Sequence, residues 1–273
     1  MMAARSRLVE ALRQSYLYPF HAVNEGIRRA VAEVAVGCRG GTLVDVGCGT
    51  RPYESLFPVE RWLGFDLPDS PHPLHQKRAN VWFDGVALPV RDHSVQHVLC
   101  SAVLQYCRDP QTYIGELVRV LAPGGNLVLV APQSEPLTEE PFDRYRFTLN
   151  ALRELCGSHG LRVVEARTAV GFWQSMAFHV NHMAVRCMLK RGKAAAALVC
   201  CPLGLLTQTT AALLDRFTAY DSDTNSWIIR AVKPAGEMAG PSAACENAIQ
   251  DHGGVWYIGE ERCCEEVLHH SRE

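Results

Sequence analysis

The sequence predicts an α/β fold in which helices cover both faces of a mostly parallel, doubly wound sheet. Seven short apolar runs have the composition of buried strands, at residues 42–47, 62–66, 80–84, 95–101, 126–131, 161–166 and 226–232. They alternate along the chain with helical or loop segments. Near-continuous apolar strands separated in this way are typical of a parallel sheet buried on both faces.

Helices are expected before and between these strands. Apolar side chains recur at helical spacing within residues 1–38, which predicts a helical N-terminal extension. A second helix has an N-cap residue in Asp109, and Pro110 suits its first helical position. This helix is expected to end at the turn that contains Gly124, and a further helix to begin at Thr148.

These elements predict a main domain at residues 39–233 and a tail at 234–273 that we expect to be disordered or loosely attached. A helical insertion at about 170–222 separates the last two strands. Its stretch 194–214 approaches the length of a membrane span, but proline, glycine and threonine interrupt it. We expect a buried or lid-forming helical hairpin there, and an interfacial membrane contact or a true span stays open.

Composition limits the classes of protein to consider. The 273 residues carry a formal net charge of −2, so no strong overall field attracts nucleic acid. The 11 cysteines are odd in number and scattered, and no CxxC pair suggests zinc. The N-terminus lacks an apolar signal core, so we expect reduced thiols and a cytoplasmic protein.

The most informative segment is a glycine turn after the first expected strand. Gly47 and Gly49 stand two apart, on either side of Cys48, and Asp45 lies at the strand end. Glycines at these positions let the backbone turn sharply and approach a ligand closely. A dinucleotide site requires a third glycine, but the sequence has Arg51 near that place. The turn therefore favours a ligand without a pyrophosphate, and Asp45 suits a positively charged group on it.

Two further carboxylates follow strands in order. Asp66 ends the second strand, 21 residues after Asp45, where a carboxylate can accept hydrogen bonds from both hydroxyls of a ribose. Asp84 ends the third strand and can accept from the exocyclic amine of an adenine. Each taken alone could be a loop-capping residue. Together they predict a nucleoside site along one edge of the sheet.

Four longer stretches carry a family resemblance. The segment DGVALP at 84–89 is similar to an adenine-side loop, and SVQHVLCSAVLQY at 94–106 to a fourth-strand motif written SFDxVxxxxxLEH. VRVLAPGGNLVL at 118–129 is similar to the motif RVLKPGGxLxL, and PFDRYRFT at 141–148 to a feature of a bacterial subgroup. The chain thus resembles the class I S-adenosylmethionine-dependent methyltransferases of the broad type 11 group, which act on small molecules.

The resemblance implies a Rossmann-like sheet with an antiparallel last strand and S-adenosylmethionine as the cofactor. It places the cofactor against a set of residues at the strand ends: Asp45, Gly47, Cys48, Gly49, Asp66, Asp84 and Ser101. This chain departs from the family at Gln96, which replaces the fourth-strand Asp, and at Gln105-Tyr106, which replaces a Glu-His pair. The second change faces the cofactor cleft in the family, so it bears on the substrate.

Candidates for the acceptor site lie in the other half of the expected sheet edge. For substrate binding they are Tyr106, Tyr145, Arg146 and Trp173, and for catalysis Asp143, Tyr145 and His179. Tyr145 can stack or donate, Asp143 can act as a base, and Arg146 can hold an anionic substrate. The alternative is a structural, salt-bridged loop at 141–148. His179 and His182 offer a base near neutral pH, or serve in packing.

The expected function is methyl transfer by in-line displacement to a small-molecule or lipid-like acceptor. The alternative is a non-catalytic binding or scaffold protein that keeps the methyltransferase fold. A nicotinamide-dependent oxidoreductase is disfavoured by the missing third glycine, and a nucleic-acid methyltransferase by the absence of a D/NPPY-type tetrapeptide. We expect no metal site. The sequence fixes neither the acceptor, the methylated atom nor the oligomeric state.

Overall fold

The computed structural model describes residues 17–68, 78–218 and 223–236, which lie in one compact unit, Met1–Met238. In chain order the elements are α2 (His21–Ala35), β1 (Thr42–Val46), η1 (Glu54–Leu56), β2 (Arg61–Asp66), β3 (Val81–Trp82), β4 (Val95–Ser101), η2 (Leu104–Tyr106), α3 (Pro110–Val120), β5 (Leu121–Pro132), α4 (Leu149–Ser158), β6 (Arg162–Thr168), α5 (Phe172–Leu189), α6 (Lys193–Thr218) and β7 (Ser226–Val232). The predicted tail from residue 237 and the extension up to residue 16 lie outside the described residues.

A seven-stranded sheet has the strand order β3-β2-β1-β4-β5-β7-β6. The pairs among β1, β2, β3, β4 and β5 are parallel, and β7 runs antiparallel to both β5 and β6. The predicted doubly wound sheet with an antiparallel last strand is confirmed. The strand order reverses between β1 and β4, and in open sheets the ligand crevice lies outside the carboxyl ends of the strands at that point.

Each face of the sheet has its own core, because neighbours along a strand point to opposite sides. On one face Leu43, Leu99 and Ile228 pack beneath α2, which contributes Val31 and Val34. The other face packs against α3 and α4, in a core whose members include Val44, Val98, Ile114, Leu117, Leu129 and Leu152. The two helices on this face are capped as expected: Asp109 accepts from the Gln111 amide and Thr148 from the Ala151 amide.

Two boundaries differ from the expectation. The third strand, expected at 80–84, spans only Val81–Trp82, because its partner β2 ends at Asp66 opposite Trp82, so Asp84 lies in the loop after β3. The other difference concerns α3. The helix α3 ends at Val120, before the Pro123-Gly124-Gly125 turn, and β5 already begins at Leu121. The early start follows from pairing, because Leu121 lies opposite Val95 and the register shifts before His97 meets Asn126. The glycines thus sit within an irregular part of the strand.

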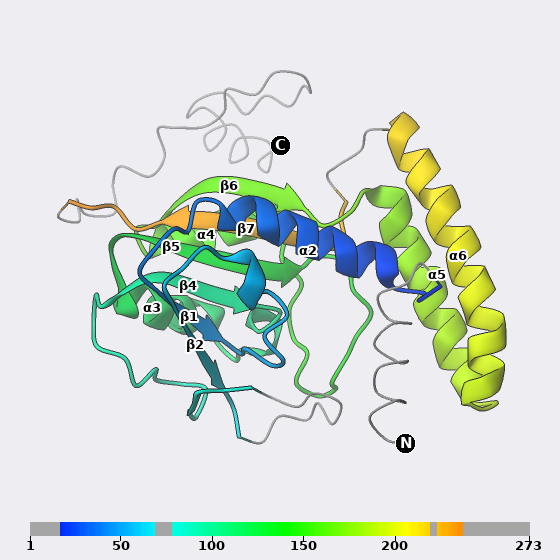
Figure 1. Cartoon of the computed structure of the whole chain (residues 1–273), viewed down its shortest axis with the longest axis horizontal. Coiled ribbons are helices and arrows are strands. Elements are labelled where there is room, and N and C mark those ends of the chain that lie inside the picture. The colour runs from blue at the N-terminus through cyan, green and yellow to red at the C-terminus, as the bar shows by residue number, and fades with distance from the viewer. Residues whose placement is uncertain (1–16, 69–77, 219–222, 237–273) are drawn as a thin grey trace, which may run out of the picture. The chain divides into compact units, whose positions relative to one another are not determined.

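The insertion between β6 and β7 forms a helical hairpin, as the sequence predicts. The helices α5 and α6 lie side by side along most of their length, beyond the end of the sheet from which β6 leads into α5 (Figure 1). Since β6 runs parallel to β5, the hairpin follows the same edge of the sheet as the glycine turn.

Polar side chains fasten the hairpin to the rest of the molecule. Gln208 accepts from the Ala22 amide at 2.7 Å and donates to the Tyr18 carbonyl at 3.1 Å. Asn181 donates to the Pro19 carbonyl at 2.8 Å. The Asp215 carboxylate of α6 accepts from two amides in the first turn of α5, where unpaired N–H groups favour a negative charge.

By length and composition α6 is apolar enough to cross a membrane, and 22% of its most apolar window is buried. Within the described residues, the eight cysteines are free thiols. No group of three or more metal-ligating side chains occurs in this part of the chain.

Candidate functional site

The glycine turn lies at the carboxyl end of β1. Gly47, Gly49 and Arg51 all have positive φ, at 75°, 48° and 58°. A Cβ on Gly47 would lie 2.2 Å from the Val103 side chain, whereas a Cβ on Gly49 would meet nothing within 4 Å. Gly47 is thus required by close packing, and the open side of Gly49 leaves room for a ligand against the backbone.

The side chain of Cys48 packs against Gly64 of β2. The thiol is buried, and a Cβ on Gly64 would lie only 2.7 Å from its sulfur. Burial raises the pKa of the thiol to about 11. Only the backbone of this residue is therefore available to a ligand, which refines the prediction of Cys48 as a cofactor-binding residue.

Asp66 ties the turn to β2. It accepts from the Gly49 amide at 2.9 Å and from the Leu67 amide at 2.7 Å. Each carboxylate oxygen can accept a second hydrogen bond, so Asp66 can also bind a diol. Asp84 is exposed, and its Oδ1 accepts from the Val86 and Ala87 amides at 2.8 and 3.2 Å. These bonds lower the pKa of Asp84 and fix the loop.

Asp45 is a buried carboxyl at the end of β1. Burial raises the pKa of this carboxyl to about 8, against the opposing effect of Arg51. A carboxyl of this kind gains free energy when a cation binds beside it, because the cation favours the ionised form. Tyr53 hydrogen-bonds with Ser101, the last residue of β4. Burial raises the pKa of the Tyr53 phenol, and the nearby carboxyl groups of Asp45 and Glu135 raise it further.

Three residues of this region escaped the sequence analysis. The Leu67 side chain lies against Gly85, so an apolar surface joins Asp66 to the loop that follows Asp84. Tyr53 follows the glycine turn and immediately precedes η1, and Glu135 lies beyond the end of β5, where burial raises its pKa. A signal existed for Leu67, which directly follows Asp66 at the end of β2, and for Glu135, which lies three residues after the end of β5.

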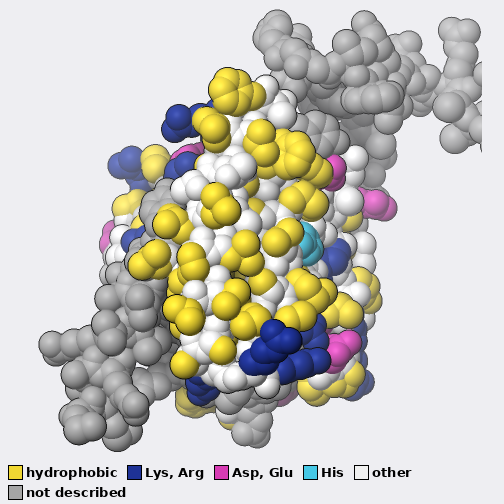
Figure 2. Space-filling model, turned by 90° about the vertical axis from the view of Figure 1, so that its right-hand side faces the viewer, with side chains coloured by type: hydrophobic (Ala, Val, Ile, Leu, Met, Phe, Trp, Pro, Cys, Tyr) yellow, Lys and Arg dark blue, Asp and Glu magenta, His cyan; other side chains and the backbone are white. Residues whose placement is uncertain are grey.

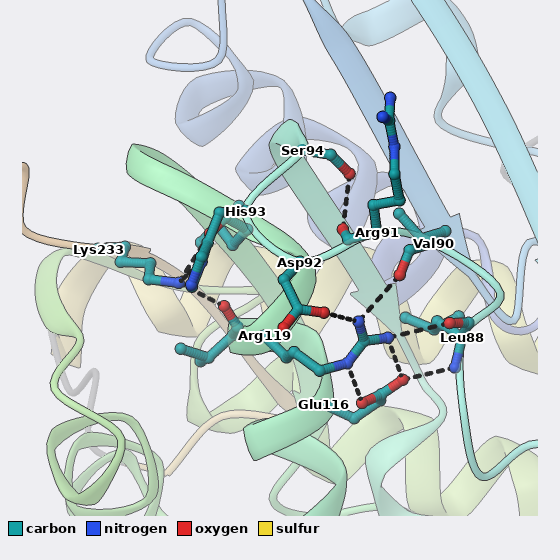
Figure 3. Close-up of polar contacts among 11 residues, drawn as sticks. Leu88, Val90, Arg91, Asp92, His93, Ser94, Glu116, Arg119 and Lys233 are labelled. Carbon is teal, nitrogen blue, oxygen red and sulfur yellow. Dashed lines mark hydrogen bonds and ion pairs between the residues drawn. The ribbon is translucent and has the colours of Figure 1, made fainter.

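Arg119 holds the loop that follows Asp84 in place (Figure 3). Its guanidinium pairs with both oxygens of Glu116 at 2.7 and 2.8 Å, pairs with Asp92, and donates to the Leu88 and Val90 carbonyls at 3.0 and 2.9 Å. Glu116 in turn accepts from the Leu88 amide at 2.6 Å. The arginine of the VRVLAPGG motif is therefore a support for the predicted adenine-side loop.

Lys233 caps the C-terminal end of α3, the helix that carries Glu116 and Arg119. Its ammonium donates to the Val118 and Leu121 carbonyls at 2.7 and 2.8 Å, at the end of α3, and lies 2.8 Å from His93 Nδ1. Burial lowers the pKa of Lys233. A cation suits a helix C-terminus, where carbonyls lack helical partners.

On the acceptor side, the loop at 141–148 is tied together by Arg146. Its guanidinium pairs with both oxygens of Asp143 at 2.6 and 2.8 Å and also donates to the carbonyls of Glu135, Pro136 and Tyr145. Although burial acts to raise it, hydrogen bonds from Arg146 and Thr138 lower the pKa of Asp143. This geometry gives both residues a structural role, and their roles toward a substrate stay predictions.

Two tyrosines lie in or beside this loop. Tyr145 donates to the Arg108 carbonyl at 3.2 Å, and the Tyr106 hydroxyl lies 3.1 Å from that of Thr138. Both phenols are thus oriented by neighbours on the β4 and β5 sides. Gln105 is buried, and its Oε1 is one of the buried side-chain atoms without a partner in the described part of the chain.

The hairpin contributes His179 and Trp173. His179 Nε2 lies 2.8 Å from Ser134 Oγ, which joins α5 to the segment after β5. Trp173 is 37% exposed in the first turn of α5. His182 packs instead against Phe178 and Phe20, so the structure favours its packing role. The sheet edge thus brings His179, Ser134 and the loop at 141–148 to one side.

A shallow hollow of about 320 Å³ lies at the opposite edge of the sheet, lined in part by Arg39, His97 and Asn126. These residues stand at or near the amino ends of the strands. The hollow is therefore separate from the glycine turn.

Comparison with known proteins agrees with this geometry. A family model described as a methyltransferase domain matches residues 44–129, from the glycine turn to the middle of β5. This part of the chain is therefore similar to methyltransferase domains, in agreement with its resemblance to the class I S-adenosylmethionine-dependent methyltransferases. The match covers the turn, Asp66, Asp84 and Ser101, and it ends before the acceptor-side loop and the hairpin.

Proteins named as methyltransferases match part of the chain. A malonyl-[acyl-carrier protein] O-methyltransferase of Hahella chejuensis is 31% identical over 131 residues, 42% of this chain and 46% of that protein. A ubiquinone biosynthesis O-methyltransferase of Escherichia coli O157:H7 is 27% identical over 121 residues, 40% of this chain and 50% of that protein. The matches thus span about half the length of these relatives or less.

Solved structures show the same fold. The [4+2]-cyclase SpnF is 20% identical with a TM-score of 0.50, over 77% of this chain and 81% of that chain. A protein provisionally assigned as a sarcosine dimethylglycine methyltransferase, from Galdieria sulphuraria, is 14% identical with a TM-score of 0.50, over 80% and 86% of the two chains. At these identities the likeness concerns the fold alone.

Proposed function

We propose that the protein transfers the methyl group of S-adenosylmethionine to a small-molecule or lipid-like acceptor in the cytoplasm. The observation that carries this proposal is the pair of buried carboxylates beside an open glycine turn. Asp45 and Asp66 lie at the ends of neighbouring parallel strands, and Gly49 leaves the backbone accessible between them.

The residues of this chain fit the cofactor in three parts. Asp45 suits the ammonium of its amino-acid portion, directly or through water, because a cation relieves the cost of ionising a buried carboxyl. Asp66 suits the ribose hydroxyls, and Leu67 with the Asp84 loop suits the adenine. The bound cofactor supplies an electrophilic methyl group on a sulfonium that leaves as a neutral thioether.

The protein's own part in the reaction is alignment and, for a hydroxyl acceptor, removal of a proton. Of the three candidate groups, His179 suits the second task best. Asp143 is paired with Arg146, and the Tyr145 hydroxyl donates a hydrogen bond to a backbone carbonyl. The hydroxyl of Ser134 can either donate to His179 or accept from it, so the imidazole stays able to take a proton.

The names of the relatives support the class of acceptor. One is named for an acyl group on a carrier protein and the other for ubiquinone biosynthesis, and both are named O-methyltransferases. We therefore propose an oxygen acceptor attached to an apolar or carrier-linked body. Tyr106, Tyr145 and Trp173 would form its aromatic surroundings.

The test pairs calorimetry with turnover. We expect S-adenosylhomocysteine to bind and NAD to bind little. With a panel of hydroxyl and carboxyl acceptors, free and lipid-linked, Tyr145→Ala and His179→Gln should lower turnover about tenfold or more, and leave S-adenosylhomocysteine affinity within a few-fold. Arg146→Ala should lower turnover as well, and its loss of loop order should appear in limited proteolysis.

Two results would contradict the proposal. Tight NAD binding without binding of either sulfur ligand would overturn the cofactor. Good cofactor binding with no methylated product from a broad panel would favour the alternative, a non-catalytic protein that keeps the fold. The fold of this family is shared by a protein named as a cyclase, which makes that second result worth testing.

A further inference from the structure

The outer side of the α5–α6 hairpin is covered by large apolar side chains (Figure 2). Along α6 they recur at helical spacing and form one stripe. Its members are Leu198, Val199, Leu205, Leu206, Leu213, Leu214 and Phe217, and the exposed fractions of Leu198, Leu206 and Phe217 are 79%, 64% and 80%. On α5, Val180, Met183 and Leu189 are also exposed. A contiguous apolar surface of this kind marks an interaction site.

The inner side of α6 has the opposite character. Its buried positions are small or polar: Ala196, Cys200, Gly204, Gln208 and Ala211. A Cβ on Gly204 would lie 2.8 Å from the Cα of Pro19, so the helix is in close contact with the segment before α2. Small residues inside with large apolar residues outside are typical of helices surrounded by lipid, and the reverse is typical of helices in water.

Charge on the hairpin is one-sided. Residues 172–214 contain four basic residues, Arg186, Lys190, Arg191 and Lys193, and no acidic residue. All four lie at or near the turn between the helices and are exposed. Figure 2 shows Lys and Arg side chains gathered at one end of the apolar surface. An apolar face bordered by basic residues fits the boundary between lipid headgroups and acyl chains in an anionic membrane.

We propose that the outer face of the α5–α6 hairpin docks on an anionic lipid bilayer, with the basic turn at the headgroups. The apolar stripe enters the interface from one side only. A full span is disfavoured because Gln208, Asn181 and Asp215 hold the inner side of the hairpin to the protein through hydrogen bonds, which a span would break.

A lipid surface explains the charge better than a second copy of the chain does. In a symmetric dimer formed through this face, both basic turns would lie in the same interface. Residues 172–214 contain no acidic side chain that could pair with them. The bilayer supplies the negative charge that the face lacks.

The docking would bring the site close to lipid. The hairpin follows the edge of the sheet that carries the glycine turn, and His179 of α5 contacts Ser134 after β5. An acceptor anchored in the membrane would then reach the acceptor side without leaving it. The docking proposal itself does not depend on methyl transfer.

The test is sedimentation of the full-length protein with vesicles. We expect binding to vesicles of equal parts phosphatidylcholine and phosphatidylglycerol, weaker binding to phosphatidylcholine alone, and weakening by salt. The triple variant L198S, L206S and F217S should bind the mixed vesicles at least about tenfold more weakly than the wild type, and its Tm should be unchanged. Val36→Ser, at another exposed apolar residue, is its matched control and should bind like the wild type.

The basic turn has its own variant. Lys190→Glu with Arg191→Glu should abolish the preference for phosphatidylglycerol, while Arg153→Glu with Arg162→Glu, at exposed positions on α4 and β6, should retain it. The proposal is overturned if the wild type does not sediment with mixed vesicles, or if the triple serine variant binds as well as the wild type. Resistance to alkaline carbonate extraction would replace docking by a span. A wild-type dimer that the serine variant makes monomeric, without vesicle binding, would assign the face to a second copy.

Discussion

In the sheet, the largest buried side chains are leucines and isoleucines, such as Leu43, Leu99 and Ile228, whereas the α5–α6 hairpin buries alanine, glycine and cysteine and exposes its leucines. Both regions are rich in apolar residues, but they place them on opposite sides. The sheet is stabilised by removing large apolar area from water. The hairpin is held by close backbone approach and by polar side chains such as Gln208 and Asn181. The apolar content of an element therefore does not determine which of its faces is buried in the protein.

The largest effect should come from the sheet side, at Asp66. Asp66→Ala removes charged hydrogen bonds to the ribose and to the Gly49 amide, so it should weaken S-adenosylhomocysteine binding by about 1.5–3 kcal/mol. Calorimetry measures this. Asp84→Ala is the comparison: that carboxylate is fully exposed, so a smaller loss is expected. Equal losses at the two positions would show that the buried strand end has no special weight.

On the hairpin, the small inner residues can be tested by enlarging one of them. Gly204→Leu should lower the free energy of unfolding by about 1–3 kcal/mol, because its side chain would collide with Pro19. Leu206→Ser on the outer stripe should change it by less than about 0.5 kcal/mol. Thermal and denaturant unfolding measure both. The contrast fails if the outer substitution costs as much as the inner one.

The protonation of Asp45 should make both stability and cofactor binding depend on pH. Burial raises the pKa of Asp45 to about 8 in the folded protein, from 3.8. The folded state therefore binds more protons between these values, and its stability without cofactor falls as pH rises through them, by at most about 1.4 kcal/mol per unit.

A cation bound at Asp45 favours the ionised form, so S-adenosylmethionine affinity should rise over the same window, by at most about tenfold per unit. Calorimetry between about pH 6 and 7.5 tests this, with Asp45→Asn as the control that removes the titrating group. A wild-type affinity that is flat with pH would place the ammonium away from Asp45.

The smallest effect is expected for the tail. Residues from about 240 lack a sustained apolar period, so a truncation before Ala239 should leave Tm nearly unchanged. Differential scanning calorimetry of the two lengths measures this. A large drop in Tm would mean that Trp256 and Tyr257 dock on the domain.

Local patterns in the sequence predict the sheet, which is confirmed, and the residues of the cofactor side, whose roles toward a ligand stay predictions. The glycine turn, Asp45 and Asp66 belong to short segments in which strand, turn and carboxylate follow one another, so a local pattern specifies them. The helix caps Asp109 and Thr148 were predictable for the same reason. A match to known methyltransferases covers this same part of the chain.

The remaining features could not be predicted from local patterns, because they depend on partners that are far apart in sequence. Asp215 caps a helix that begins more than 40 residues earlier, and Gln208 binds the backbone at Ala22, 186 residues away. Those contacts choose which side of α6 faces inward, and the choice leaves its leucines exposed. The same holds for Arg119 and Glu116, which hold a loop separated from them by about 30 residues. Local pattern fixes what an element is, and long-range contacts fix which of its faces is left for a partner.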